Sequence, residues 1–205
     1  MSRLARKNLQ TPFLHIMVQG INKDYIFSKN EYIETYLNII YKYQKKYPVT
    51  IIAYCIMNNH AHLLVHIDDI QILGKFMHIV NLIYSQFYNK VNNRCGVIFR
   101  NKYKVEPIYT IKHLINCINY IHLNPVKAKM VKSCIQYQYS SYTDYLNNTG
   151  ICKNPTINKI FGDNFDFSNL LDSDSNNIFM DIDSPSSLEI MVQMDKRIKR
   201  VFKSK

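Results

Sequence analysis

Residues 49–67 read VTIIAYCIMNNHAHLLVHI, two apolar runs that meet at a pair of asparagines. Residues 49–57 are rich in β-branched and aromatic side chains, which favour strands. Asn58 and Asn59 are typical turn residues, and residues 60–67 return to the apolar pattern. We therefore expect a β-hairpin over residues 49–67, with the turn at the two asparagines.

The segments around this hairpin predict an α+β fold. In chain order we expect a strand over 12–21, a helix over 28–47, the hairpin, a helix over 70–89, a strand or bent pair of strands over 97–109, and a helix from about 110 to 124. Ser28 and Glu31 have the spacing of a capping box at the start of the first helix. The first six elements have the split β-α-β order, which predicts a ferredoxin-like antiparallel sheet with helices packed on it.

Charge divides the chain into two parts. The 205 residues carry a formal net charge of +11 and an isoelectric point of about 9.3. Residues 1–150 hold 18 Lys and Arg against 7 Asp and Glu, whereas residues 151–205 hold 8 of each sign. The basic part favours polyanions, with nucleic acid ahead of anionic membranes. We expect one domain over 1–150, then an acidic and finally basic tail over 151–205, partly disordered, with a short helix near 187–202.

The cysteines and the hydropathy pattern indicate the compartment. Five cysteines without any CxxC pair favour reduced thiols in a cytosol. No apolar run approaches membrane-spanning length, and no apolar core of signal length follows the basic N-terminus. We therefore expect a cytoplasmic protein with no membrane partner.

Two histidines in the second strand of the hairpin have the pattern of a metal site. Side chains two residues apart in a strand point to the same face, so His60 and His62 lie side by side, and His66 shares their parity. Such a His-x-His pair can bring two imidazole nitrogens to one metal ion. The pattern is also compatible with ordinary surface or half-buried histidines.

The stretch 119-NYIHLNPVKAKMV-131 supplies a second set of polar groups. Tyr120 and Asn124 are four residues apart, so they share one face of a helix. Pro125 disfavours helical dihedrals in the residue before it, which predicts that Asn124 ends the helix. An amide oxygen from Asn124 would complete a two-histidine site for Mg²⁺ or Mn²⁺. A phenol has a pKa of about 10, so Tyr120 needs such a cation nearby to attack phosphorus.

These segments together resemble a known family of enzymes. The stretch 57-MNNHAHLLV-65 is similar to the "HUH" motif of single-tyrosine transposases of the insertion sequence 200/605 type. The stretch 120-YIHLNPVKAKMV-131 resembles the catalytic helix of their REP-associated tyrosine transposase branch. Segments 14–27, 96–108 and 140–146 fit as well, so the resemblance covers roughly residues 12–147.

The resemblance implies an activity and a site. Tyr120 matches the nucleophile that cleaves single-stranded DNA, leaving a 5′-phosphotyrosine and a free 3′-hydroxyl. His60, His62 and Asn124 match the ligands of Mg²⁺ or Mn²⁺. The family implies a ferredoxin-like fold and a DNA partner with hairpin or palindromic structure, and we expect either a monomer or a homodimer. The chain has Gln19 where the family often has arginine, and Asn58 where it usually has proline.

Basic residues near the two motifs are candidates for DNA binding. They are Arg100, Lys102, Lys104, Lys127 and Lys129, each of which could equally be a solvated surface cation.

Two other functions fit parts of the sequence. A non-catalytic module that binds single strands by stacking would explain the charge and the 16 tyrosines, but not the pairing of His-x-His with Tyr-x-x-x-Asn. A zinc hydrolase with His60, His62 and His66 as ligands would make Tyr120 dispensable. Covalent attachment of a hairpin DNA to the protein, and the residue that carries it, would separate the three functions.

Overall fold

The fold is built on one four-stranded antiparallel sheet. The computed structural model describes residues 11–147 and 150–152. The strands are β1 (Phe13–Gln19), β2 (Val49–Ile56), β3 (His60–Ile67) and β4 (Lys104–Ile108). They lie in the order β2-β3-β1-β4, and each neighbouring pair is antiparallel. The predicted hairpin is thus present, and the predicted α+β, ferredoxin-like fold is confirmed.

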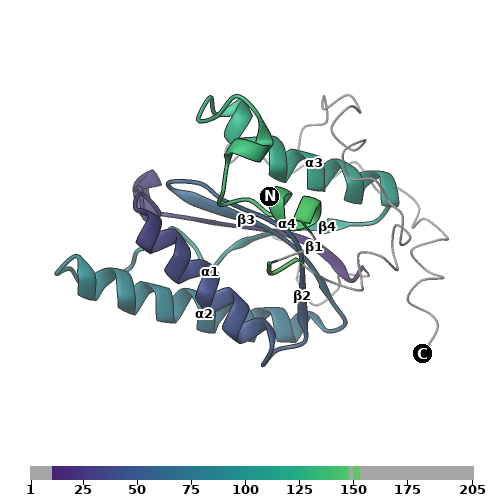
Figure 1. Ribbon diagram of the computed structural model, residues 1–205. Helices are drawn as coiled ribbons and strands as arrows, with labels where there is room; N and C mark the ends of the chain where they lie inside the picture. Colours follow the sequence, from purple (N-terminus) through teal and green to yellow (C-terminus); the bar gives the residue numbers. More distant parts are fainter. Residues whose placement is uncertain (1–10, 148–149, 153–205) are drawn as a thin grey trace.

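Helices cover both faces of this sheet (Figure 1). On one face lie α1 (Asn30–Gln44) and α2 (Ile70–Val91), which pack against each other. On the opposite face lie α3 (Ile111–Lys127) and the short α4 (Tyr142–Asn147). Two 3-10 turns, η2 (Ile21–Lys23) and η3 (Cys134–Gln136), complete the elements of the described residues. No helix of the described residues is both long and apolar enough to cross a bilayer.

The two faces of the sheet differ in chemistry because side chains alternate along each strand. On the α1–α2 side, β1 contributes apolar residues such as Leu14 and Ile16, and β3 contributes Leu63 and Val65, all of them buried. This face forms the main hydrophobic core. On the α3 side, the same strands place histidines and other polar groups beneath the helix.

The helix boundaries differ from the prediction at two places. The helix α1 begins at Asn30 with Lys29 as its N-cap and no side-chain cap, so the predicted capping box at Ser28 and Glu31 is wrong. The helix α3 continues past Pro125 to Lys127, so the prediction that Asn124 ends the helix is wrong too.

The helix α3 continues because its last turn keeps most of its hydrogen bonds. Proline removes only its own N–H donor. The N–H groups of Ala128 and Met130 still donate to the carbonyls of Asn124 and Pro125, at 2.9 Å each. Of the predicted strand region 97–109, only Lys104–Ile108 forms a strand, with one isolated bridge between Phe99 and Gly20.

A segment that the sequence did not predict covers the outer edge of β2. The N–H of Ile56 donates to the carbonyl of Tyr139, and the N–H of Ser141 donates to the carbonyl of Tyr54, both at 2.9 Å. The Ser141 hydroxyl accepts from the N–H of Tyr54, also at 2.9 Å. The predicted tail lies, except for residues 151 and 152, outside the described residues.

Candidate active site

The α3-facing side of the sheet carries a short row of histidines. In the register of β1 and β3, His60 pairs with Gln19, His62 with Met17, and Leu64 with His15. Paired residues point to the same face, so His15 lies on the same side as His60 and His62. The ring of His62 is 5.0 Å from that of His60 and 5.1 Å from that of His15, measured between ring centroids.

The predicted ligand His60 is held in one orientation by Asn59. The His60 Nδ1 lies 2.6 Å from Asn59 Oδ1, while the amide nitrogen of Asn59 donates to the carbonyl of Lys23 at 3.4 Å. Because the amide oxygen can only accept, His60 Nδ1 carries the proton and Nε2 carries the lone pair. Burial lowers the pKa of His60 to about 4, so the ring is neutral at neutral pH.

The side chain of Tyr120 lies directly above this row. Its ring meets His62 edge-on at 5.4 Å and His15 at 5.9 Å between centroids. Tyr120 is partly buried and packs against the core. The structure therefore brings together Tyr120 and the His-x-His pair, which lie far apart in the sequence.

The direction of α3 places Asn124 on the His60 side of Tyr120. The helix follows β4 and runs antiparallel to it, toward the end of the sheet where β1 stops and β3 begins (Figure 1). The side-chain nitrogen of Asn124 donates to the carbonyl of Tyr120 at 2.9 Å. This bond uses the amide nitrogen as its donor and leaves the amide oxygen, the atom that could bind a metal, as an acceptor.

These residues fit the metal that the family implies. His60 has a lone pair on Nε2, and Asn124 has an amide oxygen, which together are ligand atoms of the kind that Mg²⁺ or Mn²⁺ binds. Burial and the neighbouring His15 and His60 hold the pKa of His62 well below its usual range, so this ring is also neutral. The ligand roles of His60, His62 and Asn124 remain predictions.

Three of the predicted DNA-binding cations lie close to this site. The ammonium of Lys127 sits 5.7 Å from the centre of the Tyr120 ring. The guanidinium of Arg100 donates to the side-chain oxygen of Gln19 at 3.5 Å, and Gln19 pairs with His60. Lys104 pairs with Met17, which in turn pairs with His62, so its half-buried side chain starts on the α3 face.

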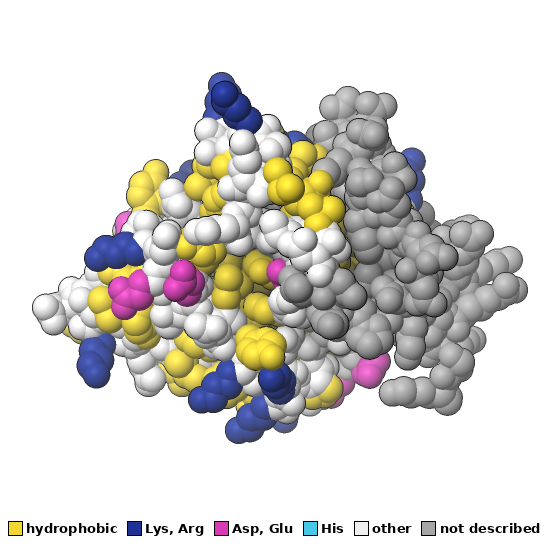
Figure 2. Space-filling view, viewed as in Figure 1, with side chains coloured by type: hydrophobic (Ala, Val, Ile, Leu, Met, Phe, Trp, Pro, Cys, Tyr) yellow, Lys and Arg dark blue, Asp and Glu magenta, His cyan; other side chains and the backbone are white. Residues whose placement is uncertain are grey.

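The other two cations are not brought to the site. The carbonyl of Lys102 accepts from Asn81 of α2, on the opposite side of the sheet, and Lys102 is exposed. Lys129 is exposed beyond the end of α3, with a positive φ of 57°. On the face drawn in Figure 2, the Lys and Arg side chains stand in separate groups and form no continuous patch. The cations beside Tyr120 are therefore the main candidates for DNA binding.

Two further residues on this face of the sheet, His15 and Glu106, were not among the predicted site residues. His15 is fully buried, and its Nε2 lies 2.9 Å from Nδ1 of His62. Its other nitrogen, Nδ1, lies 3.6 Å from a carboxylate oxygen of Glu106, which pairs with His15 across β1 and β4. The position of His15 in the first strand already suggested a supporting role beneath the metal, but only the register of the three strands brings its side chain together with those of Glu106 and His62.

The three-histidine zinc site is not formed. His66 is four residues beyond His62, about 13 Å along the strand, and its ring packs against Phe13 at 5.2 Å. Within residues 11–147 and 150–152, no three His, Cys, Asp or Glu side chains converge on a metal position. The zinc-hydrolase alternative therefore lacks its ligands.

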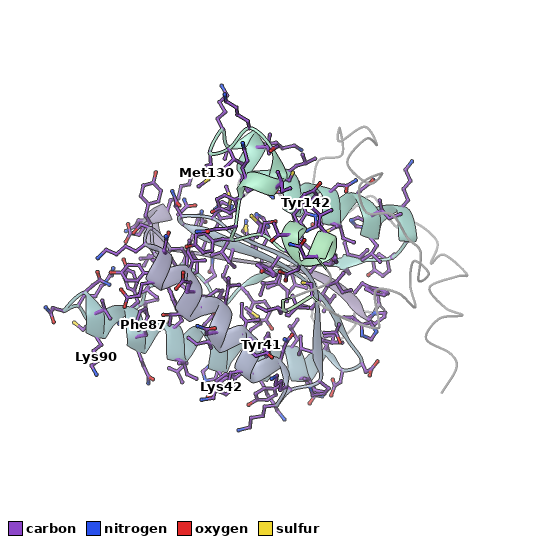
Figure 3. All side chains as sticks on the ribbon, viewed as in Figure 1. Tyr41, Lys42, Phe87, Lys90, Met130 and Tyr142 are labelled. Carbon is purple, nitrogen blue, oxygen red and sulfur yellow. The ribbon has the colours of Figure 1, made fainter. Side chains whose placement is uncertain are left out.

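His122, two residues after Tyr120, has a structural environment. Its Nε2 lies 2.8 Å from the hydroxyl of Ser141, and its ring meets Tyr142 and Tyr145 edge-on. Figure 3 shows Tyr142 beneath α3. Burial lowers the pKa of His122 to about 3. This histidine links α3 to the segment that covers β2.

Comparison with known proteins identifies the family. The family model described as "Transposase IS200 like" matches residues 10–124. A Haemophilus influenzae protein named "Putative REP-associated tyrosine transposase" is 25% identical over 144 residues, which cover 63% of this chain and 78% of the relative. A solved structure of a REP-associated tyrosine transposase bound to a REP hairpin has the same fold, with a TM-score of 0.59 and 18% identity over 72% of this chain and 86% of that chain. The family indicated by the sequence motifs is thus confirmed, and the chain belongs to the IS200-like transposases.

Proposed function

We propose that this chain is a metal-dependent transposase that cleaves and rejoins single-stranded DNA at hairpin sequences through a 5′-phosphotyrosine on Tyr120. The observation that carries the proposal is the position of Tyr120. Its ring lies 5.4 Å from that of His62, above the row of histidines and beneath the ammonium of Lys127.

The side chains around Tyr120 would have separate tasks. Lys127, Arg100 and Lys104 would bind the phosphates on either side of the scissile bond, since cations position the DNA backbone. His60, His62 and Asn124 would hold Mg²⁺ or Mn²⁺. Such an ion, when bound, polarises a phosphodiester and stabilises its developing negative charge. The packing of Tyr120 against His15 and His62 would fix the phenol in one orientation.

The cleavage step conserves atoms and charge. The phenol oxygen of Tyr120 loses its proton and forms a bond to phosphorus, while the bond from phosphorus to the 3′ oxygen breaks. The 3′ oxygen takes up a proton and leaves as a hydroxyl. Because the new bond keeps the energy of a phosphodiester, a 3′-hydroxyl can reverse the step and rejoin a strand.

A labelled hairpin oligonucleotide tests the proposal directly. DNA from the flanks of the gene, containing an imperfect palindrome, is incubated with the protein and Mn²⁺, and the products are separated under denaturing conditions. We expect an adduct that retains a 3′-terminal label and loses a 5′-terminal one, mapped by mass spectrometry to Tyr120. Tyr120→Phe should bind the same hairpin and form no adduct.

Two results would contradict the proposal. An adduct on another tyrosine, such as Tyr103 or Tyr109, would reject the assignment of the nucleophile while keeping the enzyme class. Tight hairpin binding without any adduct, across a range of flanking sequences and metals, would instead favour the non-catalytic binding module.

A further inference from the structure

The buried His15 and the half-buried Glu106 form a pair that lies next to the proposed metal ligand His62. Both side chains face α3, on neighbouring strands of the sheet. His15 is fully buried and His62 is 1% exposed. Because both rings are buried, bulk water does not orient them. Their orientation depends on contacts with neighbouring side chains.

The contacts form a chain of three groups. Glu106 lies 3.6 Å from Nδ1 of His15, and Nε2 of His15 lies 2.9 Å from Nδ1 of His62. Among the described residues, neither that carboxylate oxygen nor His15 Nδ1 has another hydrogen-bond partner. These two buried polar atoms face each other, and neither has another partner in the described part of the chain. They need to move closer by only a few tenths of an ångström to form a hydrogen bond.

The chemistry of the chain fixes where the protons are. A carboxylate accepts hydrogen bonds, so the His15 nitrogen that faces Glu106 is the N–H. In the form of His15 that carries a single N–H, its Nε2 is then an acceptor. The group that donates to it at 2.9 Å is then Nδ1–H of His62. His62 is left with its lone pair on Nε2, the nitrogen that is free of this chain.

We propose that Glu106 and His15 are positioning residues that hold His62 in the Nδ1–H tautomer and so make its Nε2 ready to bind a metal ion. Asn59 does the same for His60 with a single contact. The two metal ligands would thus be set by different partners, one from the adjacent turn and one through the sheet. The inference rests on the proposed metal-dependent function, and partners of this kind commonly orient histidine ligands.

The opposite tautomer would disable the site. If His15 donated from Nε2, Nδ1 of His62 would have to accept, and the proton of His62 would move to Nε2. A protonated Nε2 has no lone pair for a metal. The position of one proton, two strands away from Glu106, therefore decides whether His62 can be a ligand.

The first test is made on the unaltered, metal-free protein. Nitrogen-15 spectra of ring-labelled histidines distinguish the two tautomers, and single-histidine variants assign the signals. We expect both His15 and His62 as Nδ1–H tautomers. A His62 signal from the Nε2–H form would overturn the inference.

The second test measures Mn²⁺ affinity by calorimetry, which requires no DNA and no turnover. His15→Phe keeps a buried ring but removes both contacts, and should weaken Mn²⁺ binding about 10- to 100-fold. Glu106→Gln keeps an acceptor for His15 and should cause a smaller loss. The matched control is His66→Phe on the same face of β3, which should leave the affinity unchanged.

The outcomes separate this inference from the proposed function. Equal Mn²⁺ affinity in His15→Phe and the unaltered protein would overturn the positioning role, and so would absence of Mn²⁺ binding by the unaltered protein. The DNA adduct on Tyr120 is measured independently of both. If His15→Phe does not fold, the tautomers of the unaltered chain and the affinity of Glu106→Gln still decide the question.

Discussion

Asn124 and Tyr120 share one face of α3, but their proposed roles respond differently to substitution. Asn124→Ala removes one of three ligands, and mass action can offset weaker metal binding. We expect adduct formation to fall at least tenfold at low Mn²⁺ and to recover partly at high Mn²⁺. Tyr120→Phe should recover under no metal condition, because no other nucleophile occupies its place. If adduct formation by Asn124→Ala does not depend on the Mn²⁺ concentration, the ligand role of Asn124 is contradicted.

Lys127 and Lys102 form a matched pair of exposed lysines at different places. Lys127 lies over the ring of Tyr120, whereas the backbone of Lys102 contacts α2 on the opposite side of the sheet. We expect Lys127→Gln to weaken hairpin binding and to reduce the salt slope by about 1, the change expected for one lost phosphate contact. Lys102→Gln should leave both unchanged. Fluorescence anisotropy at several salt concentrations measures the two quantities, and equal effects would reject the site-specific role of Lys127.

Local spacing predicted some of these residues and could not predict others. The parity of His60 and His62, and the four-residue step from Tyr120 to Asn124, are properties of a single strand or helix. His15 and Glu106 are different, because their roles depend on the register between β1, β3 and β4. His15 and His62 are 47 residues apart in the chain. The local spacing within a single sequence contains no signal for a contact of that kind.

At the scale of elements, His122 attaches the tyrosine helix to the covered edge of β2, and this attachment should depend on pH. The folded protein holds His122 neutral, with a pKa of about 3, whereas the unfolded chain takes up a proton near pH 6.5. The free energy of unfolding should therefore be highest above pH 6.5 and fall as the pH drops toward 4. Each unit of pKa difference is worth about 1.4 kcal/mol.

Urea unfolding in excess chelator measures this dependence. His122→Gln keeps a polar group near Ser141 but binds no proton, so the pH dependence between 6.5 and 4 should become shallower. His60 and His62 also have lowered pKa values and should account for part of the remaining slope. His78→Gln, at an exposed position of α2, is the matched control. An unchanged slope in His122→Gln would show that His122 is not held neutral by the fold.

Element types were predictable where periodicity or β-branching was strong, and element ends were less so. The four strands and three long helices follow from such patterns. The end of α3 could not be predicted from Pro125, because later N–H groups and the Asn124 side chain stabilise one more turn. The segment over 139–141 shows no strand pattern of its own, and it is held by bonds to β2 and by the hydroxyl of Ser141.

At the scale of the whole molecule, the net charge predicts how DNA binding responds to salt. Residues 1–150 carry the whole surplus of +11. If Arg100, Lys104 and Lys127 each neutralise one phosphate, log affinity should fall against log salt with a slope of about −3. A hairpin with single-stranded flanks should bind more tightly than a random duplex of equal length. A flat salt response, or equal affinity for the duplex, would contradict this prediction.

The covered edge of β2 limits how two copies of this protein could associate. An open edge strand offers unpaired N–H and C=O groups, and a second chain can pair with them to extend the sheet. Here the outward groups of Tyr54 and Ile56 are bound by residues 139–141, and the carbonyl of Ile52 accepts from the Tyr145 hydroxyl. Three successive outward positions are therefore already occupied. A homodimer, one of the two forms that the family resemblance implies, could therefore not extend the sheet through this part of β2, and this edge gives aggregates no template on which to grow.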